Sequence, residues 1–189
     1  MAQPVNLAIA LLHHPVYNKL GEVVTTALTN LDLHDIARSS RTFGLERFYI
    51  VTPSADQRAL AQRITGHWQD GWGSTYNPDR KQALDIVRVC ETLPEAVRDF
   101  QSGFDEPVRT VITGAARRPG SITCREFRQM LDKPESPFLL LLGTGWGLTE
   151  VCFQAADHIL EPIAGSGTYN HLSVRSAAAI MLDRLRGTP

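Results

Sequence analysis

The sequence LLLLGTGWGLT at residues 139–149 joins an unbroken run of leucines to three glycines at alternate positions. The leucine run predicts a strand buried on both faces, as is typical of a parallel sheet covered by helices. Gly143, Gly145 and Gly147 allow the following backbone to adopt positive φ and to approach a ligand closely. Three glycines exceed what a tight turn needs, so this stretch is interpreted as a buried strand that leads into a ligand-binding loop.

Apolar runs alternate with helical patterns on both sides of this stretch. Strands are expected at residues 5–12, 47–52, 86–89, 108–113, 138–142 and 159–160, and helices at residues 29–44, 54–68, 93–101, 122–131, 148–156 and 172–185. Residues 71–80 are rich in turn-forming residues and favour a connecting loop. The alternation predicts an α/β fold with a mostly parallel sheet and helices on both faces.

The composition is that of a globular protein, with 189 residues, 43% hydrophobic residues and 21% charged residues. This length predicts a single domain over residues 1–189. The net charge of −1 gives no overall basic field, although a local basic patch on a neutral protein could still bind a nucleic acid. Cys90, Cys124 and Cys152 are widely spaced, so they favour a reducing cytoplasm and indicate no metal site. The apolar run at residues 5–12 is too short to cross a membrane.

Ligands in parallel sheets bind beyond the carboxyl ends of the strands. This rule selects the loops at residues 113–116, 143–147 and 161–169 as the candidate site. The glycine loop lacks the GxGxxG spacing of dinucleotide-binding loops and follows a late strand, which argues against a nicotinamide-dependent oxidoreductase.

The sequence TNLDLHDIARSSRTFG at residues 29–44 predicts a helix that Asn30 or Asp32 can cap. Asp35, Arg38 and Arg41 recur at helical spacing and would place one acid and two guanidinium groups on one polar face. Ordinary solvated ion pairs are the alternative interpretation of this face.

Three segments in this order resemble the motifs of the SPOUT RNA methyltransferases, and in particular the bacterial branch similar to tRNA guanine-N1 methyltransferases. The first is ARSSRTFGLERFYIV at residues 37–51, in which Arg38 stands five residues before Phe43. The second is the glycine loop, and the third is LEPI at residues 160–163 followed by YNHLSVRSAAAI at residues 169–180. The resemblance extends over essentially the whole chain.

The last motif differs from that of the ribose 2′-O-methyltransferases, which carry an asparagine there. An ungapped match places Ser173 at that position, and Asn170 matches only with a shift. The glutamate that this branch carries in the glycine loop is replaced by Gly145 or Trp146. A base nitrogen and a ribose 2′-hydroxyl therefore both stay open as the methylated atom.

The resemblance implies a deep trefoil knot in the C-terminal half, a homodimer, and S-adenosylmethionine (SAM) as the cofactor. Leu142, Ile163 and Leu172 would enclose its adenine, and backbone groups would hydrogen-bond to the ring. The residues implied to bind the cofactor are Thr113, Gly114, Leu142, Gly143, Thr144, Gly145, Gly147, Pro162, Ile163, Tyr169, Asn170, Leu172 and Ser173.

The resemblance also implies residues for the reaction itself. Arg38 is the candidate cation beside the reacting nucleotide or a phosphate contact, and Asp35 is either a base or the carboxylate that orients Arg38. Asn170 or Ser173 is the site residue of the last motif, and Arg175 would face a second subunit or the RNA. Arg41, Arg117 and Arg118 are candidate phosphate contacts, as is the pair Arg80-Lys81. The alternative is a SPOUT-like protein that binds RNA or SAM without catalysis.

Overall fold

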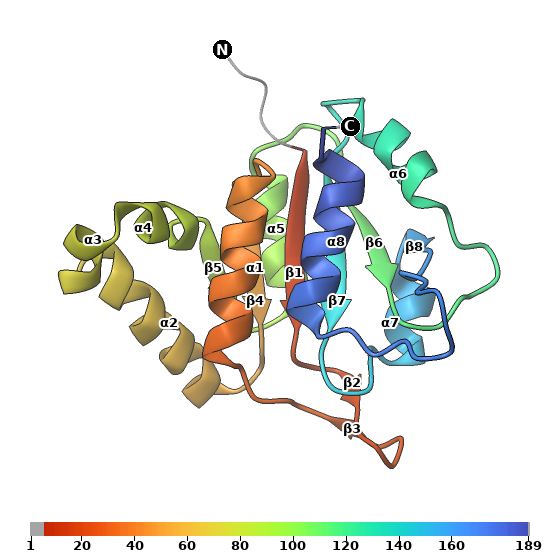
Figure 1. Cartoon of the computed structure of the whole chain (residues 1–189), viewed down its shortest axis with the longest axis horizontal. Coiled ribbons are helices and arrows are strands. Elements are labelled where there is room, and N and C mark those ends of the chain that lie inside the picture. The colour runs from red at the N-terminus through yellow and green to blue at the C-terminus, as the bar shows by residue number, and fades with distance from the viewer. Residues whose placement is uncertain (1–5, 189) are drawn as a thin grey trace.

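The central feature of the fold is a six-stranded sheet in which every paired strand is parallel (Figure 1). The computed structural model describes residues 6–188, so Val5 of the first predicted strand lies outside the described residues. The strand order is β5-β4-β1-β7-β6-β8. The strands are β1 (Leu7–Leu12), β4 (Phe48–Val51), β5 (Val87–Cys90), β6 (Arg109–Thr113), β7 (Phe138–Gly143) and β8 (His158–Leu160). The predicted parallel sheet is confirmed.

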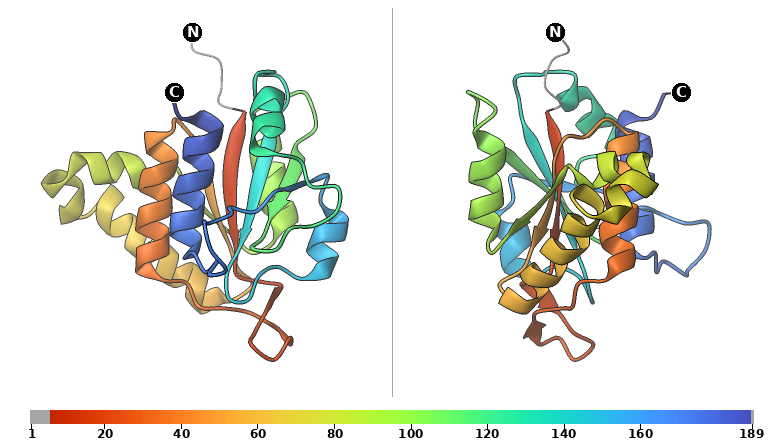
Figure 2. Two further views of the ribbon diagram at one scale, coloured as in Figure 1. Left: turned by 45° about the vertical axis from the view of Figure 1, so that its right-hand side comes forward. Right: turned by 90° about the vertical axis from the view of Figure 1, so that its left-hand side faces the viewer.

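Helices cover both faces of this sheet, as predicted (Figure 2). Leu7, Ile9 and Leu11 of β1 pack on one side with α1 (Asn30–Thr42), α6 (Cys124–Leu131) and α8 (Val174–Arg186). Ala8 and Ala10 of the same strand pack on the other side with α5 (Leu93–Gln101) and α7 (Glu150–Ala155). Successive side chains of a strand point to opposite faces, so a strand covered on both sides needs an unbroken apolar run.

The segment between β4 and β5 differs from the prediction. It contains α2 (Ala55–Gln69), α3 (Trp72–Tyr76) and α4 (Pro78–Leu84), so two short helices replace the loop expected at residues 71–80. The turn-forming residues there begin a helix: the Asn77 side chain accepts a hydrogen bond from the Arg80 amide, and Pro78 occupies the first turn. This α2–α4 arm, residues 55–84, projects past the β5 edge of the sheet at the left of Figure 1.

A small antiparallel hairpin, β2 (Val16–Tyr17) with β3 (Val23–Val24), was not predicted. Two residues in each strand are too few to give a periodic pattern in the sequence. The hairpin lies below the carboxyl ends of the central strands in Figure 1. It therefore adds a wall to the end of the sheet where ligands are expected.

The first and last helices begin with side-chain caps. Thr29 caps α1, whereas Asn30 and Asp32, the predicted caps, lie inside the helix. Ser173 caps α8, since its hydroxyl accepts a hydrogen bond from the Ser176 amide. Among the helices of residues 6–188, none has the combined length and apolar character that crossing a membrane would require.

Candidate functional site

The three loops selected from the sequence follow adjacent strands, because β7, β6 and β8 are neighbours in the sheet. The Asn170 side-chain amide donates a hydrogen bond of 3.1 Å to the carbonyl of Ala115, which ties the third loop to the first. The Thr113 hydroxyl donates one of 3.4 Å to the carbonyl of Leu160, so the ends of β6 and β8 are also joined. The structure thus brings the predicted cofactor residues of the first and third loops together at the carboxyl ends of the strands.

The glycine loop is held by the hairpin. The Trp146 amide donates to the Tyr17 carbonyl at 3.0 Å, and the Tyr17 amide donates to the Gly147 carbonyl at 2.9 Å. The Thr144 hydroxyl hydrogen-bonds to the hydroxyl of Thr26 and donates to the Leu12 carbonyl at 3.2 Å. The predicted ligand loop is therefore a fixed structure, ordered by contacts within the chain.

Two of the glycines in this loop lie so close to neighbouring atoms that a side chain would not fit. A Cβ at position 143 would lie 2.6 Å from Cγ of Leu148, and one at position 145 would lie 2.9 Å from the Tyr17 carbonyl oxygen. Gly145 and Gly147 also have φ of +59° and +100°, which disfavours any side chain. A Cβ at position 147 would meet nothing within 4 Å, so this part of the loop has open space beside it.

Gly145→Ala is expected to destabilise the protein by about 2 kcal/mol, because it combines a strained backbone with a contact that the Tyr17 carbonyl cannot relieve. Gly120→Ala is the matched control, since Gly120 has φ of +75° and a Cβ there would meet nothing within 4 Å. Urea unfolding of both variants separates the two contributions. Equal losses would mean that the close approach to Tyr17 contributes nothing.

The third loop presents apolar surface to the outside. Tyr169 is 79% exposed and Leu172 is 46% exposed, whereas Leu142 is buried at 3%. Ile163 is half-buried and packs against the same core cluster as Leu142. Leu172 and Tyr169 are therefore accessible to a ligand, but Leu142 supports the site from the core and does not form an open wall as predicted.

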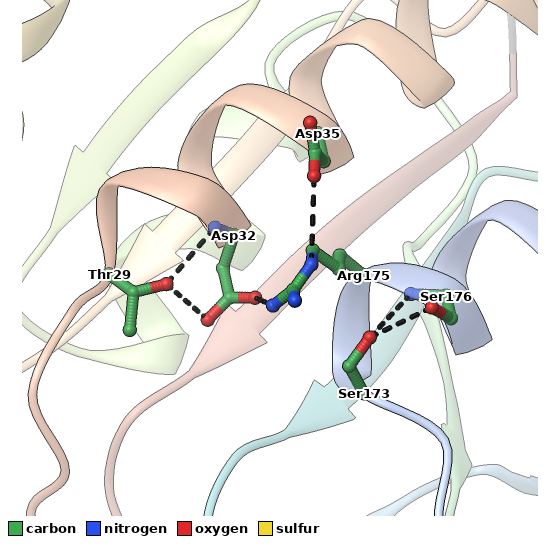
Figure 3. Close-up of polar contacts among 6 residues, drawn as sticks. All are labelled: Thr29, Asp32, Asp35, Ser173, Arg175 and Ser176. Atoms are coloured by element: carbon green, nitrogen blue, oxygen red, sulfur yellow. Dashed lines mark hydrogen bonds and ion pairs between the residues drawn. The ribbon is translucent and has the colours of Figure 1, made fainter.

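Arg175 joins the two helices that begin near these loops (Figure 3). Its guanidinium lies 3.1 Å from a carboxylate oxygen of Asp32 and 3.6 Å from one of Asp35. The other oxygen of Asp32 accepts a hydrogen bond of 2.6 Å from the Thr29 hydroxyl. Arg175 was predicted to face a second subunit or RNA, and within the chain its guanidinium is held by α1.

Asp35 was predicted to be a base or the carboxylate that orients Arg38. Its carboxylate lies against Arg175 and forms no ion pair with Arg38 within residues 6–188, which argues against the orienting role. A step of three residues falls short of a full helical turn by about 60°. Side chains at this spacing therefore point in different directions along α1. Asp32 and Asp35 face α8, whereas Arg38 and Arg41 line a hollow beside α4. The single polar face predicted for this helix is in fact two faces.

The predicted phosphate contacts also differ from one another. Arg117 is exposed, but the guanidinium of Arg118 pairs with Glu150 at 2.8 Å and lies 3.7 Å above the ring of Phe153. Arg118 is therefore engaged within the chain. Arg38 and Arg41 are exposed on the α1 face that turns toward α4.

A buried histidine at the end of β1 was not predicted. His13 is fully buried, its Nδ1 lies 3.2 Å from the Thr26 hydroxyl, and its Nε2 has no hydrogen-bond partner among the described residues. Burial lowers the pKa of His13 to about 4, while the nearby Asp32 carboxylate opposes that shift. Nothing in the local sequence distinguishes this histidine from the exposed His14 beside it.

A parallel sheet covered by helices on both faces, with loops after the neighbouring strands β6, β7 and β8 as the candidate site, defines an α/β protein of the parallel-sheet class. A probable methyltransferase from Bordetella pertussis has this fold, with a TM-score of 0.64 and 18% identity over 96% of this chain and 94% of that chain. The SpoU methyltransferase AviRb from Streptomyces viridochromogenes, described in complex with AdoMet, gives a TM-score of 0.59 and 16% identity over 98% and 58% of the two chains. At these identities the similarity establishes the fold alone.

The chain belongs to a family of SAM-dependent RNA methyltransferases, whose sequence model matches residues 6–187. It is 47% identical to a tRNA (guanine-N(1)-)-methyltransferase of Oleidesulfovibrio alaskensis and 44% identical to one of Nitratidesulfovibrio vulgaris, over 96% of its length. It spans 42% of the length of each of these two proteins. An uncharacterised protein of Aquifex aeolicus is 39% identical, with 95% of this chain covering 88% of that one. The resemblance found in the sequence motifs is confirmed.

Proposed function

We propose that this protein transfers a methyl group from SAM to RNA, and that N1 of a guanine in tRNA is the substrate atom to test first. The observation that carries this proposal is the set of three loops after the neighbouring strands β6, β7 and β8, two of them joined by the Asn170 hydrogen bond, in a chain of this family. The guanine is supported by the names of two relatives that share this segment of sequence.

The residues of the three loops fit SAM. Exposed Leu172 and Tyr169 offer apolar surface for adenine, and the open space beside Gly147 leaves room for a ligand against the backbone. We propose that the remaining predicted cofactor residues complete this cradle with their backbone groups and with support from the core; these are Thr113, Gly114, Leu142, Gly143, Thr144, Gly145, Pro162, Ile163, Asn170 and Ser173. When bound, SAM supplies an electrophilic methyl group.

Of the two candidates in the last motif, we propose Asn170 as the residue that contacts the ligand. The Ser173 hydroxyl already caps α8 and lies 2.8 Å from the hydroxyl of Ser176. Asn170 lies at the junction of two cofactor loops through its hydrogen bond to Ala115. A ligand placed between these loops would meet Asn170 first, whereas the hydroxyl of Ser173 serves the helix.

Arg38 lines the hollow beside α4 and not the loops of its own chain, so we propose that it acts across a homodimer. There its guanidinium would stabilise negative charge on the reacting nucleotide or hold an adjacent phosphate. Exposed Trp146 and Leu172 supply apolar surface for such an interface, with exposed fractions of 65% and 46%. Asp35 is proposed to fix Arg175 and α8, in preference to a role as a base.

The remaining expectations are proposals that rest on the resemblance and on composition. We propose that the loops at residues 143–149 and 161–173 belong to a deep trefoil knot, and that residues 1–189 act as one domain. Cys90, Cys124 and Cys152 are free, which agrees with a reducing cytoplasm as the compartment. Arg41 and Arg117 are proposed to contact RNA phosphates, while Arg118 would have to leave Glu150 to do so.

Calorimetry and nucleoside analysis test the proposed function. We expect the protein to bind SAM and not NAD, and to yield 1-methylguanosine, measured by mass spectrometry, when incubated with SAM and unmodified tRNA. NAD binding without SAM binding would refute the proposal in favour of an oxidoreductase. Binding of SAM and RNA without any methylated nucleoside would instead indicate a non-catalytic member of the family.

A further inference from the structure

Two hollows lie side by side where α1 meets the α2–α4 arm. The first has a volume of about 380 Å³ and is lined by Arg38, Arg41 and Arg80, together with Asp79 and Asn77. The second has a volume of about 440 Å³ and is lined by Trp68, Ile64, His67, His34 and Arg63. Arg80 lines both hollows and therefore connects them.

We propose that the two hollows form one binding site for an unpaired nucleotide of the RNA substrate. The first would take phosphate groups and the second the base and its ribose. This inference rests on the proposed function, because it assumes an RNA substrate, but it concerns a surface away from the three cofactor loops of the same chain. We call this surface the arm site.

The charge of the first hollow favours phosphate. Three guanidinium groups converge there against the single carboxylate of Asp79. Arg38 and Arg41 stand one helical turn apart on α1, and Arg80 approaches from α4. Guanidinium groups bind phosphate oxygens through two parallel hydrogen bonds, so this cluster suits the backbone of a nucleic acid.

The second hollow favours a base. The guanidinium of Arg80 lies 4.5 Å from the centre of the Trp68 ring, and the rings of His67 and His34 meet that ring edge-on at 5.1 Å and 5.7 Å. Unpaired RNA bases stack on aromatic rings and on guanidinium planes, and both are present here. The volume also falls within the range of small-molecule sites.

Two further details describe the wall of this hollow: the Trp68 ring is held in place, and one nitrogen of His34 lacks a hydrogen-bond partner within residues 6–188. A Cβ at position 73 would lie 2.7 Å from the Trp68 ring, so Gly73 lets α3 pack closely enough to fix that ring. Nδ1 of His34 is buried without a hydrogen-bond partner among the described residues. Burial lowers the pKa of His34, and Arg80 adds to this effect, so the ring beside Trp68 is neutral and adds no charge to this hollow.

An RNA strand fits this charge better than a second copy of the chain. A two-fold interface centred on the arm site would bring its arginines together with those of the partner, which like-charge repulsion disfavours. Four arginines and one aspartate line the two hollows. A polyanion is the partner that this excess of positive charge complements.

Fluorescence anisotropy with a labelled single-stranded RNA of about eight nucleotides tests the arm site, with the same sequence in a blunt duplex as the comparison. We expect Arg80→Ala to weaken binding of the single strand roughly tenfold or more. The slope of the logarithm of the binding constant against the logarithm of salt concentration should become shallower by about one, which corresponds to the loss of one phosphate contact. The exposed residues Arg63 and His67 give milder variants, Arg63→Ala and His67→Ala, with losses of roughly threefold to tenfold. Arg98→Ala, an exposed arginine of α5 on the opposite face of the sheet, should leave the affinity unchanged.

The outcomes separate this inference from the proposed function. Equal losses for single strand and duplex would overturn the base pocket, and so would unchanged affinity in the Arg80 and Arg63 variants. If a variant binds RNA normally but sediments as a smaller assembly, the surface would be assigned to contact between subunits. Wild-type protein that binds no RNA would also overturn the arm site, whereas absence of SAM binding would refute the proposed function. If Arg80→Ala does not fold, as judged by circular dichroism, the two surface variants decide the test.

Discussion

Arg38→Ala is expected to lower methyl transfer to RNA by a factor of about 100 or more while leaving the affinity for SAM unchanged. Arg38 is exposed, and within residues 6–188 it makes no ion pair that would contribute to folding. Its loss should therefore affect the reaction and not the structure. Single-turnover transfer of a labelled methyl group to tRNA, with calorimetry for SAM, measures both quantities.

Two comparisons sharpen this result. Arg41→Ala, one helical turn away, should weaken RNA binding and raise KM with little change in kcat, whereas Arg98→Ala should change neither. Mixing Arg38→Ala chains with chains that cannot bind SAM should restore part of the activity if Arg38 acts across the dimer. Unchanged transfer in Arg38→Ala on a verified substrate would remove Arg38 from the mechanism.

Arg175→Ala is expected to lower the free energy of unfolding by about 2 kcal/mol, which corresponds to a fall in Tm of about 4–8 °C. The Asp32 side chain is only 11% exposed, so losing its guanidinium partner leaves a largely buried carboxylate supported by Thr29. Asp35 would remain nearby as a like charge on α1. Thermal unfolding at neutral pH measures the effect.

Arg47→Ala is the matched control, because Arg47 and Asp99 are 3.9 Å apart with side chains that are 40% and 46% exposed. An exposed pair of this kind contributes less than about 1 kcal/mol. Asp32→Asn combined with Arg175→Ala should lose less than the sum of the two single variants, since each removes the same interaction. Additive losses would show that Arg175 and Asp32 are not coupled.

The sequence predicts those parts of this fold that depend on continuous apolar runs. β1, β4 and β7 in the centre of the sheet are such runs, and the parallel arrangement of the strands places the loops after Thr113, Gly143 and Leu160 at the same end of the sheet without further information. The order of the three motifs identified the family. These features are local or follow from one geometric rule, so no knowledge of side-chain contacts was needed.

The directions of the charged side chains could not be predicted in the same way. Asp32 and Arg175 are 143 positions apart, and helical spacing alone does not say which side of α1 meets α8 and which meets α4. The hairpin at residues 16–24 and the helices within residues 71–84 depend on contacts with the glycine loop and with Trp68. Such contacts exist only once the tertiary structure has formed.

The strand order has a consequence for synthesis on the ribosome. β1 precedes both of its neighbours in the chain and can pair with β4 first, but its other neighbour is β7, which begins only at Phe138. Until then the apolar backbone of Leu7–Leu12 has one unpaired edge, which is the kind of edge that joins other chains. A nascent chain that stalls before residue 138 would therefore be the aggregation-prone species, and rapid elongation through β7 would protect it.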